Sequence, residues 1–228
     1  KPAHTPPAMT STLLPVAICL MSAISLAATN VLVKRGGDIL TSRMVLSIVM
    51  ALSVLPLAFF VPLPPRDTLP FLALSIAVHW FYQFSAIRAL HRGDLSLVFP
   101  VMRGLGPLAT ATIASIALHE SLSFWQIAGL VAASAAIIVF AMPTGATVHA
   151  RRLDRSALFW SVMTALGVGL YAVADARAVR EMPNFLTFVV WLFLLDWIGV
   201  TLVALWQRRG GIMTAIRPQI RGGIIAGV

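Results

Sequence analysis

Charged residues are scarce in this sequence. Of its 228 residues, 11% are Asp, Glu, Lys or Arg, whereas 59% are hydrophobic. An ordinary soluble domain carries about 25% charged residues, because its surface faces water. The shortage excludes a typical soluble domain and indicates a chain whose surface faces lipid.

Cysteine is almost absent too. The single Cys19 cannot form an internal disulfide, and the sequence has no Cys/His cluster with metal-ligand spacing. It also lacks the HExxH and GxSxG motifs and a phosphate-binding loop. We therefore expect no enzyme activity, no metal and no other cofactor.

Long apolar runs make up most of the chain. A membrane-spanning helix needs about 20 apolar residues, and the sequence predicts such helices at 13–33, 43–63, 69–90, 95–118, 124–142, 157–178 and 185–206. An eighth run begins near Gln219. Since a helix broken inside lipid would leave backbone groups unpaired, we expect the polypeptide to continue beyond Val228. The short linkers leave no room for a soluble domain, so we expect a multi-pass protein of the inner cell membrane.

The basic residues are distributed unevenly over the loops. The net charge of +9 comes without an aromatic-rich basic patch, so the lipid bilayer is a better expected partner than nucleic acid. Twelve Lys and Arg residues fall in the loops after the first, third, fifth and seventh expected helices, against four on the opposite side (Lys1, Arg66, Arg177 and Arg180). The twelve are Lys34, Arg35, Arg43, Arg88, Arg92, Arg151, Arg152, Arg155, Arg208, Arg209, Arg217 and Arg221. This bias places the odd-numbered loops in the cytoplasm and the N-terminus outside.

Polar residues inside the expected helices are the first site candidates. A charge at the bilayer centre costs several kcal/mol unless it faces the bundle interior or a wet cavity. At about 1.5 Å of rise per residue, His79 and Asp196 lie near mid-helix, while Gln83 and Arg103 share a depth about 6 Å away. Depth alone makes Asp196 the better partner for Arg103. The alternative is that these side chains only join helices through hydrogen bonds.

The expected helix around Arg103 contains helix-breaking residues. Pro100 and Pro107 each remove a backbone hydrogen bond, and Gly104 and Gly106 lie between them. A kinked or loosened helix that carries a charge suits a gate beside a substrate path. The alternative is a static kink that lets helices pack closely through glycine.

Three stretches resemble one family of carriers. "FYQFSAIRALHRGDLSLVFPVMRGLGPLATATIASIALHESLSFWQIAGLVAASAAIIVF", at 81–140, resembles the third to fifth helices of EamA-type carriers of the drug/metabolite transporter superfamily. The matching residues are Tyr82, Ala89, Leu90, Gly93, Asp94, Ser96, Pro100, Pro107, Glu120, Gln126 and Gly129. "AATNVLVKRGGD" at 27–38 is similar to the end of the family's first helix, with Asn30 and Lys34. "GLYAVADARAVR" at 169–180 resembles its sixth helix, with Tyr171 and Asp175.

The resemblance implies an all-α integral membrane fold of ten helices in two inverted five-helix repeats. Residues 1–145 would form the first repeat and 146–228 the start of the second, giving seven helices and part of an eighth here. The long polar linker after the fifth expected helix fits such a seam, and an odd-numbered repeat in tandem sits inverted in the membrane. The family's termini are both cytoplasmic, in conflict with the charge bias, so orientation stays open.

The implied function is a secondary transporter that moves a small polar or amphipathic metabolite, amino-acid-like or drug-like, by alternating access. Proton coupling, export or uptake, and a homodimer all stay open. The alternative is a non-transporting membrane scaffold or subunit that requires a partner chain. Depth and resemblance together give the expected substrate-binding residues Arg103, Gln83, Tyr82, Asn30, Tyr171, Asp175, His79 and Asp196, with Pro100, Gly104, Gly106 and Pro107 as the gate.

Overall fold

The computed structural model describes residues 9–35, 37–117, 121–141, 154–208 and 210–220, and these contain helices and no strand. The elements are α1 (Met9–Arg35), α2 (Ile39–Val54), the 3₁₀ helix η1 (Leu55–Phe59), α3 (Leu69–Arg92), α4 (Leu95–Ala117), α5 (Phe124–Ala141), α6 (Arg155–Glu181), α7 (Phe185–Gln207) and the short α8 (Ile212–Ile216). The expected all-α class is confirmed. The seam at 142–153, Glu120 and the run after Ile220 lie outside the described residues.

Five helical stretches are long and apolar enough to cross a membrane. They are Ile39–Phe59, Leu69–Arg92, Leu95–Ala117, Arg155–Glu181 and Phe185–Gln207. Two further apolar stretches, Val16–Val31 and Phe124–Val139, are shorter than a full span. The described part of the chain therefore has the helices of a multi-pass membrane protein, and five of the seven expected spans are supported.

The second helix begins earlier than the sequence analysis predicted. Asp38 caps α2 by accepting a hydrogen bond from the backbone N–H of Thr41, so the helix starts at Ile39 rather than at residue 43. Arg43, which the expected helix bounds place in a loop, therefore lies inside α2 with 8% of its surface exposed. The short α8 also occupies a stretch that we had expected to be a linker.

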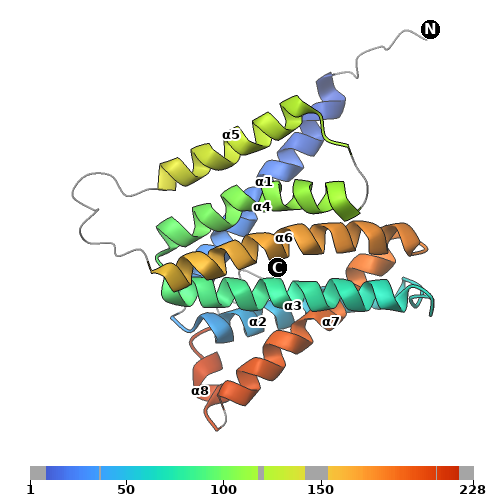
Figure 1. Ribbon diagram of the computed structural model, residues 1–228. Helices are drawn as coiled ribbons and strands as arrows, with labels where there is room; N and C mark the ends of the chain where they lie inside the picture. The colour runs from blue at the N-terminus through green and yellow to red at the C-terminus, as the bar shows by residue number, and fades with distance from the viewer. Residues whose placement is uncertain (1–8, 36, 118–120, 142–153, 209, 221–228) are drawn as a thin grey trace.

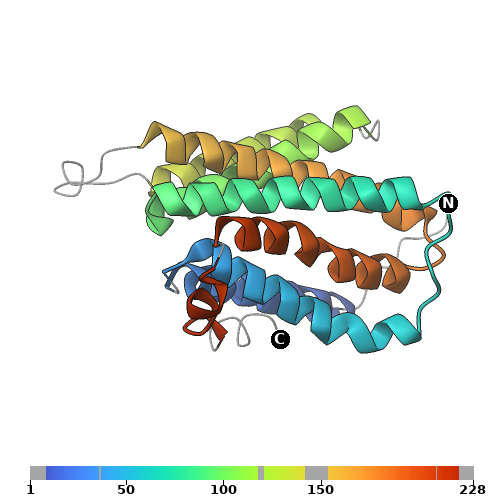
Figure 2. The ribbon, with the colours of Figure 1, turned by 90° about the horizontal axis from the view of Figure 1, so that it is seen from below.

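In Figure 1 α6 lies between α3 and α4, and in Figure 2 α3 lies between α6 on one side and α7 with α2 on the other. Helix α6 packs against α3 and against α4, which in turn carries α5, while α7 packs on α2 and also contacts α3. At one end of the bundle, Arg208 at the end of α7 forms an ion pair of 2.8 Å with Asp38 before α2. The chain just after α3 also passes close to α6 at this end, because a Cβ added to Gly93 would lie 2.9 Å from the Cβ of Ala157. We call this side, where α3 and α7 end, the basic end.

Two glycines set the position of α6 between its neighbours. A Cβ on Gly169 would lie 2.8 Å from the backbone carbon of Ala109 in α4, and one on Gly167 would lie 3.0 Å from the Cα of Tyr82 in α3. Residues two apart on an α-helix point about 200° apart, so the two glycines face different helices. The backbone of α6 can therefore approach both α3 and α4 closely.

Candidate functional site

The middle of the bundle carries polar side chains between two apolar clusters. The cluster toward the basic end includes Leu90 of α3 and Val200 of α7, and the cluster toward the other end includes Leu72, Ala178 and Leu192. The intervening parts of α3, α6 and α7 hold the residues that we call the polar layer: His79, Gln83, Tyr171, Asp175 and Asp196. All five are among the expected substrate-binding residues, and that role stays a prediction.

Asp196 is held by a hydrogen-bond network across three helices. The Gln83 side chain donates from Nε2 to Asp196 Oδ2 at 2.6 Å, and Ser47 of α2 donates to Gln83 Oε1 at 3.4 Å. The indole of Trp80 donates to the backbone carbonyl of Asp196 at 2.9 Å. A Cβ on Gly199 would lie within 2.5 Å of this indole, so the glycine makes room for it. The network joins α2, α3 and α7.

His79 pairs with Asp175 across the contact between α3 and α6. Its Nε2 lies 3.6 Å from Asp175 Oδ2, and its Nδ1 lies 3.0 Å from the carbonyl oxygen of Ser75. Because a carbonyl only accepts, the contact with Ser75 is a hydrogen bond when Nδ1 carries a proton, and Nε2 then faces the carboxyl group of Asp175. The imidazole also packs against the ring of Tyr171, with the two ring centroids 4.6 Å apart. The ring of Tyr82 contacts Tyr171 edge-on, with a centroid distance of 5.2 Å.

Helix α3 connects these two groups. His79 and Gln83 lie four residues apart, so both project from the same side of the helix. His79 interacts electrostatically with Asp175 and with Asp196. The remaining oxygens, Asp175 Oδ1 and Asp196 Oδ1, are buried and have no hydrogen-bond partner among the described residues. A buried polar atom of this kind is a position where a water, a proton or a ligand group can bind.

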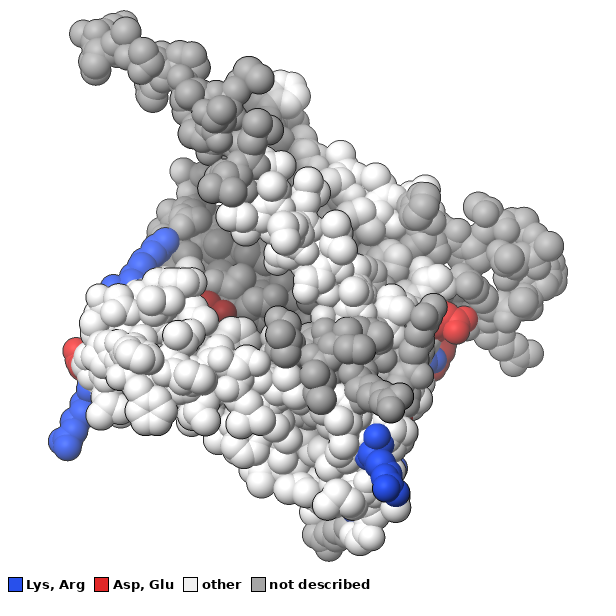
Figure 3. Space-filling view, turned by 180° about the vertical axis from the view of Figure 1, so that it is seen from behind, with Lys and Arg blue, Asp and Glu red and all other residues white. Residues whose placement is uncertain are grey.

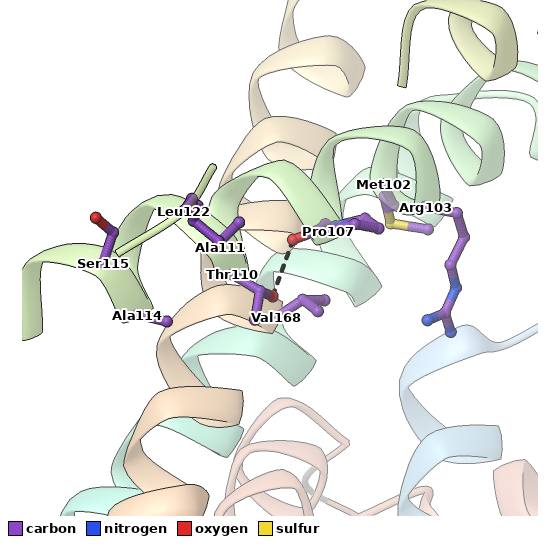
Figure 4. A pocket seen from close by; sticks show the side chains of 10 residues that line it. Met102, Arg103, Pro107, Thr110, Ala111, Ala114, Ser115, Leu122 and Val168 are labelled. Carbon is purple, nitrogen blue, oxygen red and sulfur yellow. Dashed lines mark hydrogen bonds between the residues drawn. The ribbon is translucent and has the colours of Figure 1, made fainter. Parts of the chain in front are cut away.

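Arg103 lies at the edge of the polar layer. It interacts electrostatically with Tyr171, and its guanidinium lies 5.5 Å from the centre of the Phe99 ring. It also lines a cavity of about 460 Å³ between α4, α6 and the segment before α5, whose other lining residues are Met102, Gly106, Pro107, Thr110, Ala111, Ala114, Ser115, Leu122 and Val168. In Figure 4 Arg103 lies at one end of the row of lining residues, and Ser115 lies at the other end.

The partner that depth suggested for Arg103 is wrong. Asp196 bonds to Gln83, and no ion pair joins Arg103 to Asp196 in the described part of the chain. Depth fixes a residue's position along the membrane normal but not which helices are neighbours. Helix α4 packs on α5 and α6, whereas Asp196 belongs to α7.

The proposed gate residues lie in one helix. Helix α4 continues through Pro100 and Pro107, and Figure 1 shows it changing direction about half-way along. A Cβ on Gly104 would lie 3.2 Å from Ile137 of α5, and one on Gly106 would lie 3.5 Å from Val168 of α6. The glycines therefore face neighbouring helices, as the static alternative requires. Movement of α4 stays a prediction.

The structure adds residues that the sequence analysis did not select. Arg43 is buried in α2, interacts electrostatically with Asp196, and its Nε has no hydrogen-bond partner among the described residues. Asn30, which was selected, is buried near the end of α1. Recognising Asp38 as a helix cap would have placed Arg43 inside a helix. The roles of Ser47 and Trp80 depend on helix neighbours, which have no signal in the sequence.

One face of the molecule is hollowed. Seen from behind, an acidic side chain lies at the bottom of a hollow (Figure 3). No group of three or more His, Cys, Asp or Glu residues in the described ranges could hold a metal ion. The arrangement suits reversible proton binding and polar contacts to a small molecule.

The chain matches no family model, no curated protein and no solved structure among those with which it was compared.

Proposed function

We propose that this chain forms the core of a secondary membrane transporter that moves a small polar or amphipathic metabolite by alternating access. The observation that supports this proposal is the polar layer, with two partly buried carboxyl groups midway between two apolar clusters. Ionisable groups at this depth are costly and are retained mainly along substrate and ion pathways. In this proposal the metabolite is amino-acid-like or drug-like, and the protein lies in the inner membrane.

The EamA-type resemblance is part of the same proposal. It supplies the ten-helix plan of two inverted repeats, in which substrate and coupling ions bind near the bilayer midplane. The position of the polar layer is consistent with that plan. A homodimer is compatible with it.

In this proposal the coupling ion is a proton, and the His79–Asp175 pair carries it. With the proton on His79, the pair is an imidazolium and a carboxylate at 3.6 Å. A second proton would neutralise the carboxylate and remove this attraction between α3 and α6. Loading and release of that proton would therefore change how strongly the two helices are held together, as a change of access requires.

Arg103 provides the positive charge for an anionic group of the substrate. It borders a cavity and interacts with Tyr171, and it forms no ion pair with another described residue. A guanidinium can hold a carboxylate through two parallel hydrogen bonds. The substrate would then lie between Arg103 and the polar layer.

Reconstitution of the chain alone into proteoliposomes tests the proposal. With a panel of radiolabelled amino acids and amphipathic drugs, we expect pH-gradient-driven flux for the wild type and its loss in His79→Gln. His91→Gln is the matched control, because His91 lies on the same helix but is exposed. Flux that appears only when a second membrane protein is added would favour the scaffold or subunit alternative.

A further inference from the structure

A second cavity lies along α3, away from the polar layer. It has a volume of about 580 Å³ and lies where α3 meets α2, the first turns of α6 and the last turns of α7. Its lining residues are Leu40, Phe81, Phe84, Ser85, Ile87, Arg88, His91, Trp160, Val203, Trp206 and Gln207. We call this cavity the α3 groove.

The α3 groove changes from apolar to basic along its length. Phe81 and Phe84 line the part nearer the middle of α3, whereas Arg88 and His91 lie toward the basic end. The ten-residue step from Phe81 to His91 corresponds to about 15 Å along a helix axis. The groove can therefore accommodate part of an extended chain whose polar end faces the membrane surface.

Two tryptophans and an arginine lie at the basic end of the groove. The guanidinium carbon of Arg88 lies 4.7 Å from the centre of the Trp160 ring, and Trp206 is 65% exposed. Arg88 lies four residues before the end of α3, or about 6 Å along the helix. Tryptophan at this depth marks the boundary of the hydrocarbon region, where lipid phosphates lie just beyond.

The floor of the groove contains an unsatisfied polar group. Ser85 is 1% exposed, and its hydroxyl has no hydrogen-bond partner among the described residues. It lies one turn from Arg88 on the same side of α3. A ligand with ester or phosphate oxygens near Arg88 could accept a hydrogen bond from this hydroxyl. The floor thus fits a ligand that carries acceptors at its basic end.

We propose that the α3 groove binds one anionic phospholipid, with the phosphate at Arg88 and an acyl chain along Phe84 and Phe81. None of the described residues that line it is acidic, so its charge complements a negative headgroup. Its aromatic lining favours an acyl chain over a soluble anion. Basic pockets between transmembrane helices recognise anionic headgroups in this way. This binding is independent of transport.

Tryptophan quenching by brominated lipids tests the site. The wild type is reconstituted in vesicles that contain either brominated phosphatidylglycerol or brominated phosphatidylcholine. We expect stronger quenching by the anionic lipid, because Trp160 and Trp206 line the groove. Replacing both by Phe should remove this difference while preserving the aromatic lining.

The charge requirement is tested in the same assay. Arg88→Gln should lower the preference for the anionic lipid about fivefold, since one basic residue near an anionic surface contributes about 1 kcal/mol. Arg92→Gln is the matched control, because it removes the same charge one turn further along α3 but does not line the groove. Equal quenching of the wild type by both lipids, or an equal loss in Arg88→Gln and Arg92→Gln, would overturn the proposal. Failure of either lipid to quench, because a second copy of the chain covers the groove, would also overturn it.

Discussion

The side-chain amide of Gln83 in α3 lies 2.6 Å from the carboxylate of Asp196 in α7. Both residues are near the middle of their helices, and Ser47 of α2 contacts the other side of the amide. One glutamine thus satisfies one oxygen of a carboxyl group and joins three helices. The polar layer consequently contributes to the packing of the bundle as well as to the proposed transport.

Gln83→Leu should destabilise the folded protein. Leucine is of similar size but leaves the Asp196 side chain without its donor, which should lower the free energy of unfolding by about 2 kcal/mol. Unfolding in mixed detergent micelles, followed by circular dichroism, measures the change. Gln207→Leu, at an exposed position at the end of α7, is the control and should have little effect. Equal stability of the Gln83 variant and the wild type would show that the bond contributes nothing.

Gly169→Ala should separate α4 from α6. The new Cβ would lie 2.8 Å from the backbone of Ala109, so the helices must move apart, at a cost of about 1–3 kcal/mol. Gly129→Ala on α5 is the control, because nothing lies within 4 Å of its added Cβ. Thermal unfolding of the two variants in detergent compares them. If both substitutions raised the unfolding temperature, the close approach of the α4 backbone to Gly169 would be contradicted.

The Asp38 carboxylate should stabilise the basic end in a pH-dependent way. Burial raises its pKa, but hydrogen bonds from Thr41 and Arg208 outweigh burial, so the pKa lies below its ordinary value of 3.8. A group whose pKa is lowered by folding contributes stability above its unfolded pKa and loses that contribution as the pH falls through the folded value. The contribution should therefore be full at pH 6 and decline below about pH 4.

Asp38→Asn tests this pH dependence, because asparagine can still cap α2 while the charge is removed. The wild type should be more stable than the variant at pH 6, and the difference should shrink toward pH 3. It should also shrink when Arg208 is replaced by Gln, which removes the ion pair. A difference that is the same at both pH values would exclude a role for the charge.

Arg103 should be required for transport rather than for folding. Arg103→Ala should abolish flux without reducing the yield of folded protein, and Arg103→Lys should weaken substrate binding, because an ammonium cannot form two parallel hydrogen bonds. Arg177→Ala is a matched control, since Arg177 also stacks on a phenylalanine (Phe71, at 5.7 Å) but is exposed. Normal transport per molecule with a low yield of the Arg103 variant would make the residue structural.

The sequence predicts the helices well because lipid sets their length and composition. The expected helix at 69–90 is found at Leu69–Arg92, and the polar residues within it lie at the expected mid-helix depth. The start of α2 at Ile39 differs from the expected residue 43 because Asp38 caps the helix, and the Gly37–Asp38 pair is the local signal of this cap.

Helix neighbours could not be predicted in the same way. The pairing of Gln83 with Asp196, rather than Arg103 with Asp196, depends on which helices are adjacent. That adjacency depends on small residues such as Gly169 and Gly199. The sequence does not show which helices these glycines contact. Apolar patterns specify that a helix is in the membrane, but lipid-facing and protein-facing apolar side chains look alike.

The most direct test of the transport proposal is the flux of Asp175→Asn in proteoliposomes. If the His79–Asp175 pair carries the coupling proton, the variant should lose uptake driven by a pH gradient but retain exchange of labelled for unlabelled substrate. Asp67→Asn, in the exposed connection before α3, should behave as the wild type in both assays. Unchanged gradient-driven uptake by Asp175→Asn would contradict a proton-coupling role for the pair.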